Sequence, residues 1–119
     1  MVTRLDSNGK TSQAVISGEL IHLAGQVAEN AEGADIGAQT RQALATIESL
    51  LERCGSDKSN LLHATVYLAD RTEFAAMNAA WADWVDSGNP PTRATVQATL
   101  LDPKWKVEIA VVARKRPEA

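Results

Sequence analysis

The sequence is short of cysteine, histidine and basic charge, and each shortage excludes a class of protein. Cys54 is the single cysteine among 119 residues, so the chain has neither a disulfide framework nor a cysteine cluster for zinc. His22 and His63 lie far apart in sequence with no carboxylate cluster nearby, so we expect no metal site from them. Fifteen acidic residues against twelve basic ones give a net charge of -3, which disfavours a broad nucleic-acid interface.

Long apolar runs and phosphate-binding motifs are also missing. No run approaches the ~20 apolar residues of a membrane span, and residues 1–5 contain no apolar core of signal-peptide length. The chain has no glycine-rich phosphate loop and no Gly-x-Ser-x-Gly motif, and residues 104–106 are too short a basic segment for a nucleic-acid groove. We therefore expect a cytoplasmic protein with no membrane partner, folded as one domain over residues 1–119.

The first half of the chain predicts a hairpin followed by a helix. Residues 13–17 and 20–24 are apolar runs separated only by Gly18-Glu19, a spacing with glycine first that favours a type II′ turn. A strand over residues 3–6 has little support. Residues 35–54 carry an apolar stripe of period 3.6, which predicts a helix with Gly55 as its left-handed cap. Cys54 closes this stripe and is interpreted as a small buried thiol rather than a reactive one.

The second half predicts three strands and one more helix. Residues 61–69 alternate as a strand, with Leu62, Ala64, Val66 and Leu68 on the apolar face. Asp70 and Glu73 form a capping-box pattern before a helix over residues 72–85, which is expected to bury Phe74, Met77, Trp81, Trp84 and Val85. Residues 93–101 and 106–114 alternate as the last two strands.

The resulting order, β-β-α-β-α-β-β, predicts an α+β domain with two helices on one face of a mixed sheet. The opposite face is then expected to carry a mixture too apolar for solvent and too polar for a core: Thr65, Tyr67, Thr95, Gln97, Glu108, Ala110 and Val112. An oligomer interface that contains clefts would explain such a surface.

Three residues stand out as candidates for chemistry. Arg93 follows Pro90 and Pro91, which fix its backbone, so its guanidinium either binds a carboxylate in a bidentate way or forms a surface ion pair. Asn78 lies on an apolar helix face, where its amide either holds a loop or shapes a pocket. Glu108 lies among apolar residues in a strand, where it either pairs with a cation (Arg93, Lys106 or Arg114) or transfers protons.

These residues belong to blocks that resemble the RidA/YjgF family of reactive-intermediate deaminases over essentially the whole chain. The blocks are Gly25-Gln26-Val27, Gln39-Thr40-Arg41-Gln42-Ala43-Leu44, Thr65-Val66-Tyr67-Leu68-Ala69-Asp70, Phe74-Ala75-Ala76-Met77-Asn78, Pro90-Pro91-Thr92-Arg93-Ala94-Thr95-Val96-Gln97 and Val107-Glu108-Ile109. The ending Asp102–Ile109 is similar to a divergent bacterial branch. The resemblance implies a chorismate-mutase-like fold, a homotrimer with a central barrel, and ligand clefts between subunits.

The resemblance also implies an activity and its residues. Family members hydrolyse 2-imino or 2-enamino acids to 2-keto acids and ammonia with no metal and no organic cofactor. By position, Arg93 matches the arginine that holds the substrate carboxylate, and Glu108 matches the glutamate that handles water and protons. The other matches are cleft residues: Thr95 and Gly25 through their backbones, and Asn78 from the helix.

Two positions depart from the archetypal family pattern. Thr11 stands where the archetype has a cleft tyrosine, and Ala24 stands where it has a serine. These replacements favour an alternative, a trimeric protein that binds a small carboxylate without turning it over, whereas Arg93 and Glu108 favour the deaminase. A third reading, an endoribonuclease, is disfavoured by the acidic balance and the lack of a basic patch. We expect a 2-imino or 2-keto carboxylate as the small-molecule partner.

Overall fold

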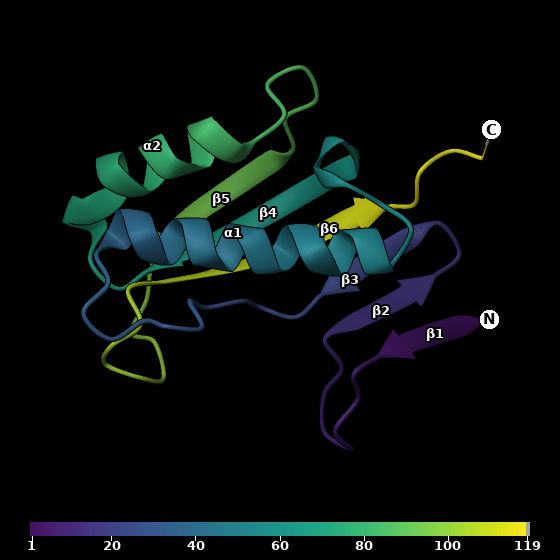
Figure 1. Ribbon diagram of the computed structural model, residues 1–119, viewed down its shortest axis with the longest axis horizontal. Helices are drawn as coiled ribbons and strands as arrows, with labels where there is room; N and C mark the ends of the chain where they lie inside the picture. Colours follow the sequence, from purple (N-terminus) through teal and green to yellow (C-terminus); the bar gives the residue numbers. More distant parts are fainter. Residues whose placement is uncertain (119) are drawn as a thin grey trace.

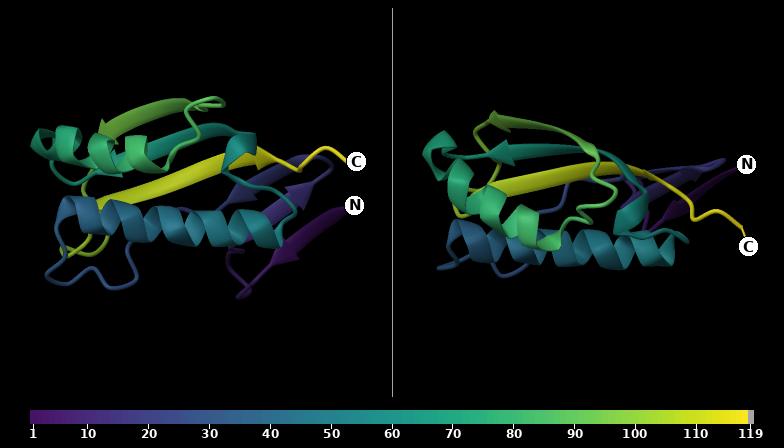
Figure 2. Two further views of the ribbon diagram at one scale, coloured as in Figure 1. Left: turned by 45° about the horizontal axis from the view of Figure 1, so that its top comes forward. Right: turned by 90° about the horizontal axis from the view of Figure 1, so that it is seen from above.

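The computed structural model describes residues 1–118, and its centre is a six-stranded mixed sheet with both helices packed against one face (Figures 1 and 2). The strands are β1 (Val2–Leu5), β2 (Ala14–Ser17), β3 (Leu20–Leu23), β4 (Leu61–Leu68), β5 (Thr92–Gln97) and β6 (Val107–Arg114). The helices are α1 (Ile36–Arg53) and α2 (Phe74–Trp84), and short 3-10 turns, Lys58–Asn60 and Arg71–Glu73, precede β4 and α2. The α+β class is confirmed, and β1 adds one strand to the predicted order.

The strands lie in the order β1-β2-β3-β6-β4-β5. All neighbours are antiparallel except β4 and β5, which run parallel because α2 returns the chain to the same end of the sheet. β6 comes last in the chain and lies between β3 and β4, so the sheet is continuous only when this C-terminal strand has paired with both neighbours. This arrangement makes β5 an edge strand with α2 beside it (Figure 1).

Local signals set the hairpin and the ends of α1 as predicted. Gly18 has a φ of 61° while Glu19 stays outside the positive-φ region, which is the pattern of a type II′ turn. The Asp35 carboxylate accepts a hydrogen bond from the Ala38 N–H at 2.8 Å and caps the start of α1. Gly55 has a φ of 78° and ends α1 in the left-handed region, so its predicted role is confirmed.

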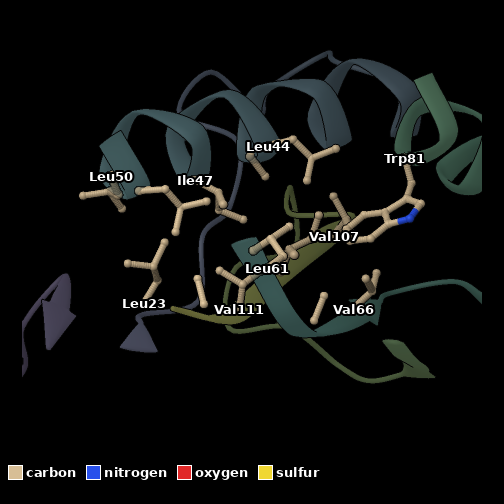
Figure 3. Packing of buried hydrophobic residues seen from close by; sticks show 14 of the residues in the cluster. Leu23, Leu44, Ile47, Leu50, Leu61, Val66, Trp81, Val107 and Val111 are labelled. Atoms are coloured by element: carbon tan, nitrogen blue, oxygen red, sulfur yellow. The ribbon is translucent and has the colours of Figure 1, made fainter. Parts of the chain in front are cut away.

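The core lies between α1, α2 and the helix-facing side of the sheet (Figure 3). The stripe of α1, including Leu44 and Ile47, packs over the inward residues of β4 and β6, such as Val66 and Val111. Cys54 is buried at the end of this stripe, and burial raises the pKa of its thiol. The prediction of a small buried thiol is therefore confirmed.

Three predictions of burial or capping are wrong for local reasons. The register shifts between Leu61 and His63, so Leu61 rather than Leu62 points inward, and Leu62 is 43% exposed. Phe74 is 42% exposed because it begins α2 at the edge of the sheet, outside the core. Asp70 caps the short turn before α2 by accepting from the Thr72 N–H at 2.9 Å, and within residues 1–118 the Glu73 side chain makes no reciprocal bond.

The face of the sheet without helices, here called the open face, differs from the prediction along β5. The parallel register pairs Val66 with Thr95 and Leu68 with Gln97, which places Thr95 and Gln97 on the helix-facing side. Ala94 and Val96 take their place on the open face, and Val96 is 46% exposed. The rest of the predicted open face is confirmed by the pairing of Thr65 with Ala110, Tyr67 with Glu108, and His63 with Val112. Among residues 1–118, neither helix is long and apolar enough to cross a membrane.

Candidate functional site

Arg93 points from β5 toward α2, where its guanidinium lies against two aromatic rings. The Cζ atom is 5.2 Å from the ring centroid of Trp81 and 5.7 Å from that of Phe74. Such contacts fix the faces of a guanidinium and leave its N–H edges free. Within residues 1–118 the Arg93 side chain makes no hydrogen bond and no ion pair. Burial lowers the pKa of Arg93 from its ordinary value, yet an arginine remains positively charged at neutral pH.

A chain of packed groups holds the rings against Arg93. Trp81 is only 7% exposed and packs on Trp84, with ring centroids 5.7 Å apart and an interplanar angle of 53°. The Trp84 Nε1–H donates a hydrogen bond of 2.7 Å to the Glu48 carboxylate on α1. The guanidinium is therefore positioned through both helices, while its hydrogen-bonding edges have no protein partner. This is the arrangement expected of an anchor for a planar anion such as a carboxylate.

Asn78 and Thr95 complete what we call the Arg93 group. Asn78 lies four residues after Phe74 and three before Trp81, so the helix places it on the same face as the two rings that flank Arg93. Its half-buried side chain forms no hydrogen bond within residues 1–118. Thr95 follows Arg93 by two residues and faces the same side of the sheet. The amide, the hydroxyl and the guanidinium thus share the space at the edge of β5 under α2.

Glu108 lies elsewhere, on the open face of β6 beside Gly25. An isolated bridge joins Gln26 to Ile109 through two backbone hydrogen bonds of 2.8 and 2.9 Å, which brings Gly25 next to Glu108. A Cβ at position 25 would overlap the Glu108 carboxylate, so only glycine leaves room for that carboxylate in its present place.

The predicted ion pairs of Glu108 do not form. Glu108 has no ion pair within residues 1–118, and Arg114 pairs instead with Glu19 at 3.4 Å. Arg93 points to the other side of the sheet and cannot reach Glu108 in the same protomer. The carboxylate therefore stays available to a ligand or a water.

Ala24 lies beside Gly25 on the Glu108 side, whereas Thr11 lies in the loop between β1 and β2. The backbone N–H of Ala24 donates to the Gln13 carbonyl at 2.9 Å, and the Gln26 side chain donates to that of Gln13 at 2.8 Å. Thr11 precedes Gln13 by two residues in the exposed loop between β1 and β2, where its N–H is held by the Asn8 side chain at 2.9 Å. We call Ala24, Gly25 and Glu108 the Glu108 group, and the structure does not bring Thr11 into it.

Apart from Thr11, the predicted site residues thus fall into two groups that do not meet within one protomer. Ala64, the neighbour of Arg93, and Tyr67, the neighbour of Glu108, are three residues apart on β4. From strand rise and spacing, the two Cα atoms are about 14 Å apart, and the two side chains leave opposite faces. A molecule the size of an amino acid cannot contact both in one protomer, so a site that uses both needs a second copy of the chain.

Sequence reasoning missed the two rings around Arg93. The i, i+4, i+7 spacing of Phe74, Asn78 and Trp81 was visible, but their partner on β5 depended on the parallel register with β4. Residues 1–118 contain no group of three or more His, Cys, Asp or Glu side chains placed to hold a metal ion. A hollow of about 700 Å³ between the loops at residues 31–35 and 102–106 contains none of the predicted site residues.

Comparison with known proteins agrees with the fold and with the order of the motifs. Residues 1–115 match the family model described as endoribonuclease L-PSP. The chain is 47% identical over 112 residues to the RutC family protein YoaB of Escherichia coli, with 94% of this chain and 96% of that protein covered. It is 43% identical to a RutC family protein of Haemophilus influenzae, with 94% and 97% covered.

A solved structure gives the same result. The crystal structure of a YjgF family member from Neisseria meningitidis superposes with a TM-score of 0.95 at 41% identity, covering 99% of this chain and 98% of that one. The match extends over the sheet, both helices and the loops that carry the Arg93 and Glu108 groups. The chain therefore belongs to the YjgF/RidA family, which includes the RutC family proteins.

Proposed function

We propose that this protein hydrolyses reactive 2-imino and 2-enamino acids to 2-keto acids and ammonia, in sites formed between copies of the chain. The observation that carries this proposal is the Arg93 guanidinium, which is held between Phe74 and Trp81 with no hydrogen-bonding partner in the protein. A positioned guanidinium with free edges fits a carboxylate, the group that all of these substrates share.

The chemistry needs few groups besides this anchor. Glu108 accepts a proton from water as the water oxygen forms a bond to the imine carbon; the C=N π pair moves onto nitrogen, and Glu108 returns the proton to that nitrogen. Glu108 then takes the hydroxyl proton of the carbinolamine and passes it to the nitrogen, so the C–N bond breaks, ammonia leaves and the 2-keto acid remains. Positioning of the substrate and proton transfer account for the rate enhancement. Asn78 and the backbones of Thr95 and Gly25 line the site, and no metal or organic cofactor takes part.

The separation of the two groups supports a site that spans two subunits. Arg93 at the β5 edge of one protomer and Glu108 on the open face of another would contact the same ligand where that edge meets the neighbouring open face. The open face carries the apolar side chains of Val96 and Val112 among polar ones, a composition that suits a subunit interface. We propose a homotrimer, in which each of three equivalent interfaces holds one ligand.

A binding protein without turnover is the second candidate function. Ala24 places no hydroxyl in the Glu108 group, and Thr11 offers no ring from the β1–β2 loop, so fewer side chains would surround the reacting carbon. The family model's description names a ribonuclease, but a net charge of -3 does not favour a phosphate backbone.

The test is keto-acid and ammonia production from freshly generated 2-imino acids of graded side-chain size. We expect the protein to accelerate hydrolysis above the rate in buffer. Binding of 2-keto acids without any acceleration would establish the second function and refute the first.

A further inference from the structure

Phe74 is unusual among the large apolar residues of the molecule because it has an open ring face beside an unpaired cation. It is 42% exposed, yet its ring centroid lies 5.7 Å from the Arg93 Cζ. Trp81, on the other side of the guanidinium, is 7% exposed and has little free surface. Of the two rings that fix Arg93, only that of Phe74 can also contact a bound molecule.

We infer that Phe74 is the specificity-determining residue of this site, and that it selects 2-imino or 2-keto acids with large apolar side chains. The inference rests on the proposed function only in taking Arg93 as the carboxylate anchor. It adds the class of side chain that the site prefers.

The geometry follows from the size of a bidentate ion pair. N–H···O distances of about 2.8 Å place the carboxylate carbon about 4 Å from the Arg93 Cζ, in the plane of the guanidinium. The Phe74 ring centroid lies 5.7 Å from the same Cζ, so a ligand side chain reaches the ring only if it is long enough to extend back from the second carbon toward α2. A methyl group covers little of the ring, whereas a phenyl or branched alkyl group covers much of it.

The polar members of the Arg93 group strengthen this assignment. Asn78 lies between the two rings on α2, and Thr95 lies beside Arg93 on β5, so both surround the polar end of the ligand. The Phe74 ring is then the apolar surface that remains for the side chain. Removal of the ring should lower kcat/KM more for large substrates than for small ones. If Phe74 only held Arg93 in place, its removal would lower kcat/KM equally for all substrates.

The experiment compares hydrolysis of two 2-imino acids, generated from phenylalanine and from alanine, by the full-length protein and three variants. We expect Phe74→Ala to lower the ratio of kcat/KM for the phenyl substrate over the methyl substrate by about tenfold. Phe74→Leu should restore part of the ratio. Leu20→Ala is the control. It removes a side chain of similar exposure (44%) on β3, three strands from the β5 strand that carries Arg93, and should leave the ratio unchanged. Circular dichroism and light scattering check the fold and assembly of each variant.

An equal fall in kcat/KM for both substrates would overturn the inference, as would an unchanged ratio in Phe74→Ala with its assembly intact. A second measurement separates this failure from that of the proposed function. If the wild-type protein hydrolyses neither imino acid, the ratio of dissociation constants for phenylpyruvate and pyruvate is measured instead. A wild-type preference for phenylpyruvate that Phe74→Ala removes would support the subsite without turnover. No preference, or no binding of either keto acid, would overturn it.

Discussion

The two faces of the sheet differ in how their polar groups are used. On the helix-covered face, Arg93 is held by two aromatic rings and supported through Trp84 and Glu48, while its N–H edges remain free. On the open face, Glu108 lies against Gly25 and has no ion-pair partner within residues 1–118. One face presents a fixed cation, and the other presents an unpaired carboxylate.

In the function that we propose, this difference would divide binding from proton transfer. A guanidinium fixed by packing suits binding, because its geometry is set before the ligand arrives. An unpaired carboxylate against a glycine backbone suits proton transfer. Because the two leave opposite faces of one sheet, the site that we propose would take Arg93 from one protomer and Glu108 from another.

The largest effect is expected at Arg93. Arg93→Ala and Arg93→Lys should each lower kcat/KM for 2-imino acids by roughly a hundredfold or more, because a charged hydrogen bond to the substrate contributes a few kcal/mol and lysine lacks the planar fork. Arg41→Ala, at an exposed position on α1, is the control and should keep full activity. Near-wild-type turnover by Arg93→Lys on every imino acid tested would refute the anchor role.

A smaller and different effect is expected at Glu108. Glu108→Gln keeps the size of the side chain but cannot accept a proton, so kcat should fall by about tenfold or more. Binding of 2-keto acids, measured by calorimetry, should change by less than about threefold, since Arg93 still holds the carboxylate. A large loss of binding with kcat unchanged would show that the roles of the two faces are reversed.

The role of the open face as a subunit interface can be tested with two separate variants that each replace an alanine by glutamate. Ala110→Glu places a charge on the open face of β6, and we expect the mass in solution to fall about threefold, from trimer to monomer. Ala45→Glu places the same charge on the exposed side of α1 and should leave the trimer intact. Light scattering provides the masses, and circular dichroism should show that both protomers fold. A trimer that persists in Ala110→Glu would place the interface elsewhere.

Much of the fold could be predicted because its signals are local. The stripe of α1 and its Gly55 cap depend on residues within one helix, and the type II′ turn depends on two residues between two apolar runs. The same holds for the strand alternation of β6, in which Val107, Ile109 and Val111 are buried as expected. These elements were correct because neighbouring residues alone determine them.

The errors arose where a residue's position depends on a distant partner. The sequence pattern places Thr95 and Gln97 on the wrong face, because the alternation within β4 and β5 does not reveal the parallel register in which the two strands pair. Leu62 was misplaced by the irregularity between Leu61 and His63. For the same reason, sequence identified Arg93 and Glu108 as candidates but could not show that they leave opposite faces of the sheet.

Mixing of variant subunits tests directly the claim that Arg93 and Glu108 act on one ligand from different protomers. Arg93→Ala and Glu108→Gln protomers are co-refolded in equal amounts, and hydrolysis is compared with each variant refolded alone. In a ring of three, an intact site needs a wild-type Arg93 from one protomer and a wild-type Glu108 from its neighbour. With equal amounts of the two variants, each of these two positions holds the required protomer half of the time, so about one interface in four has an intact site. We therefore predict recovery of about a quarter of the wild-type activity. Activity no greater than the average of the two variants alone would contradict the claim.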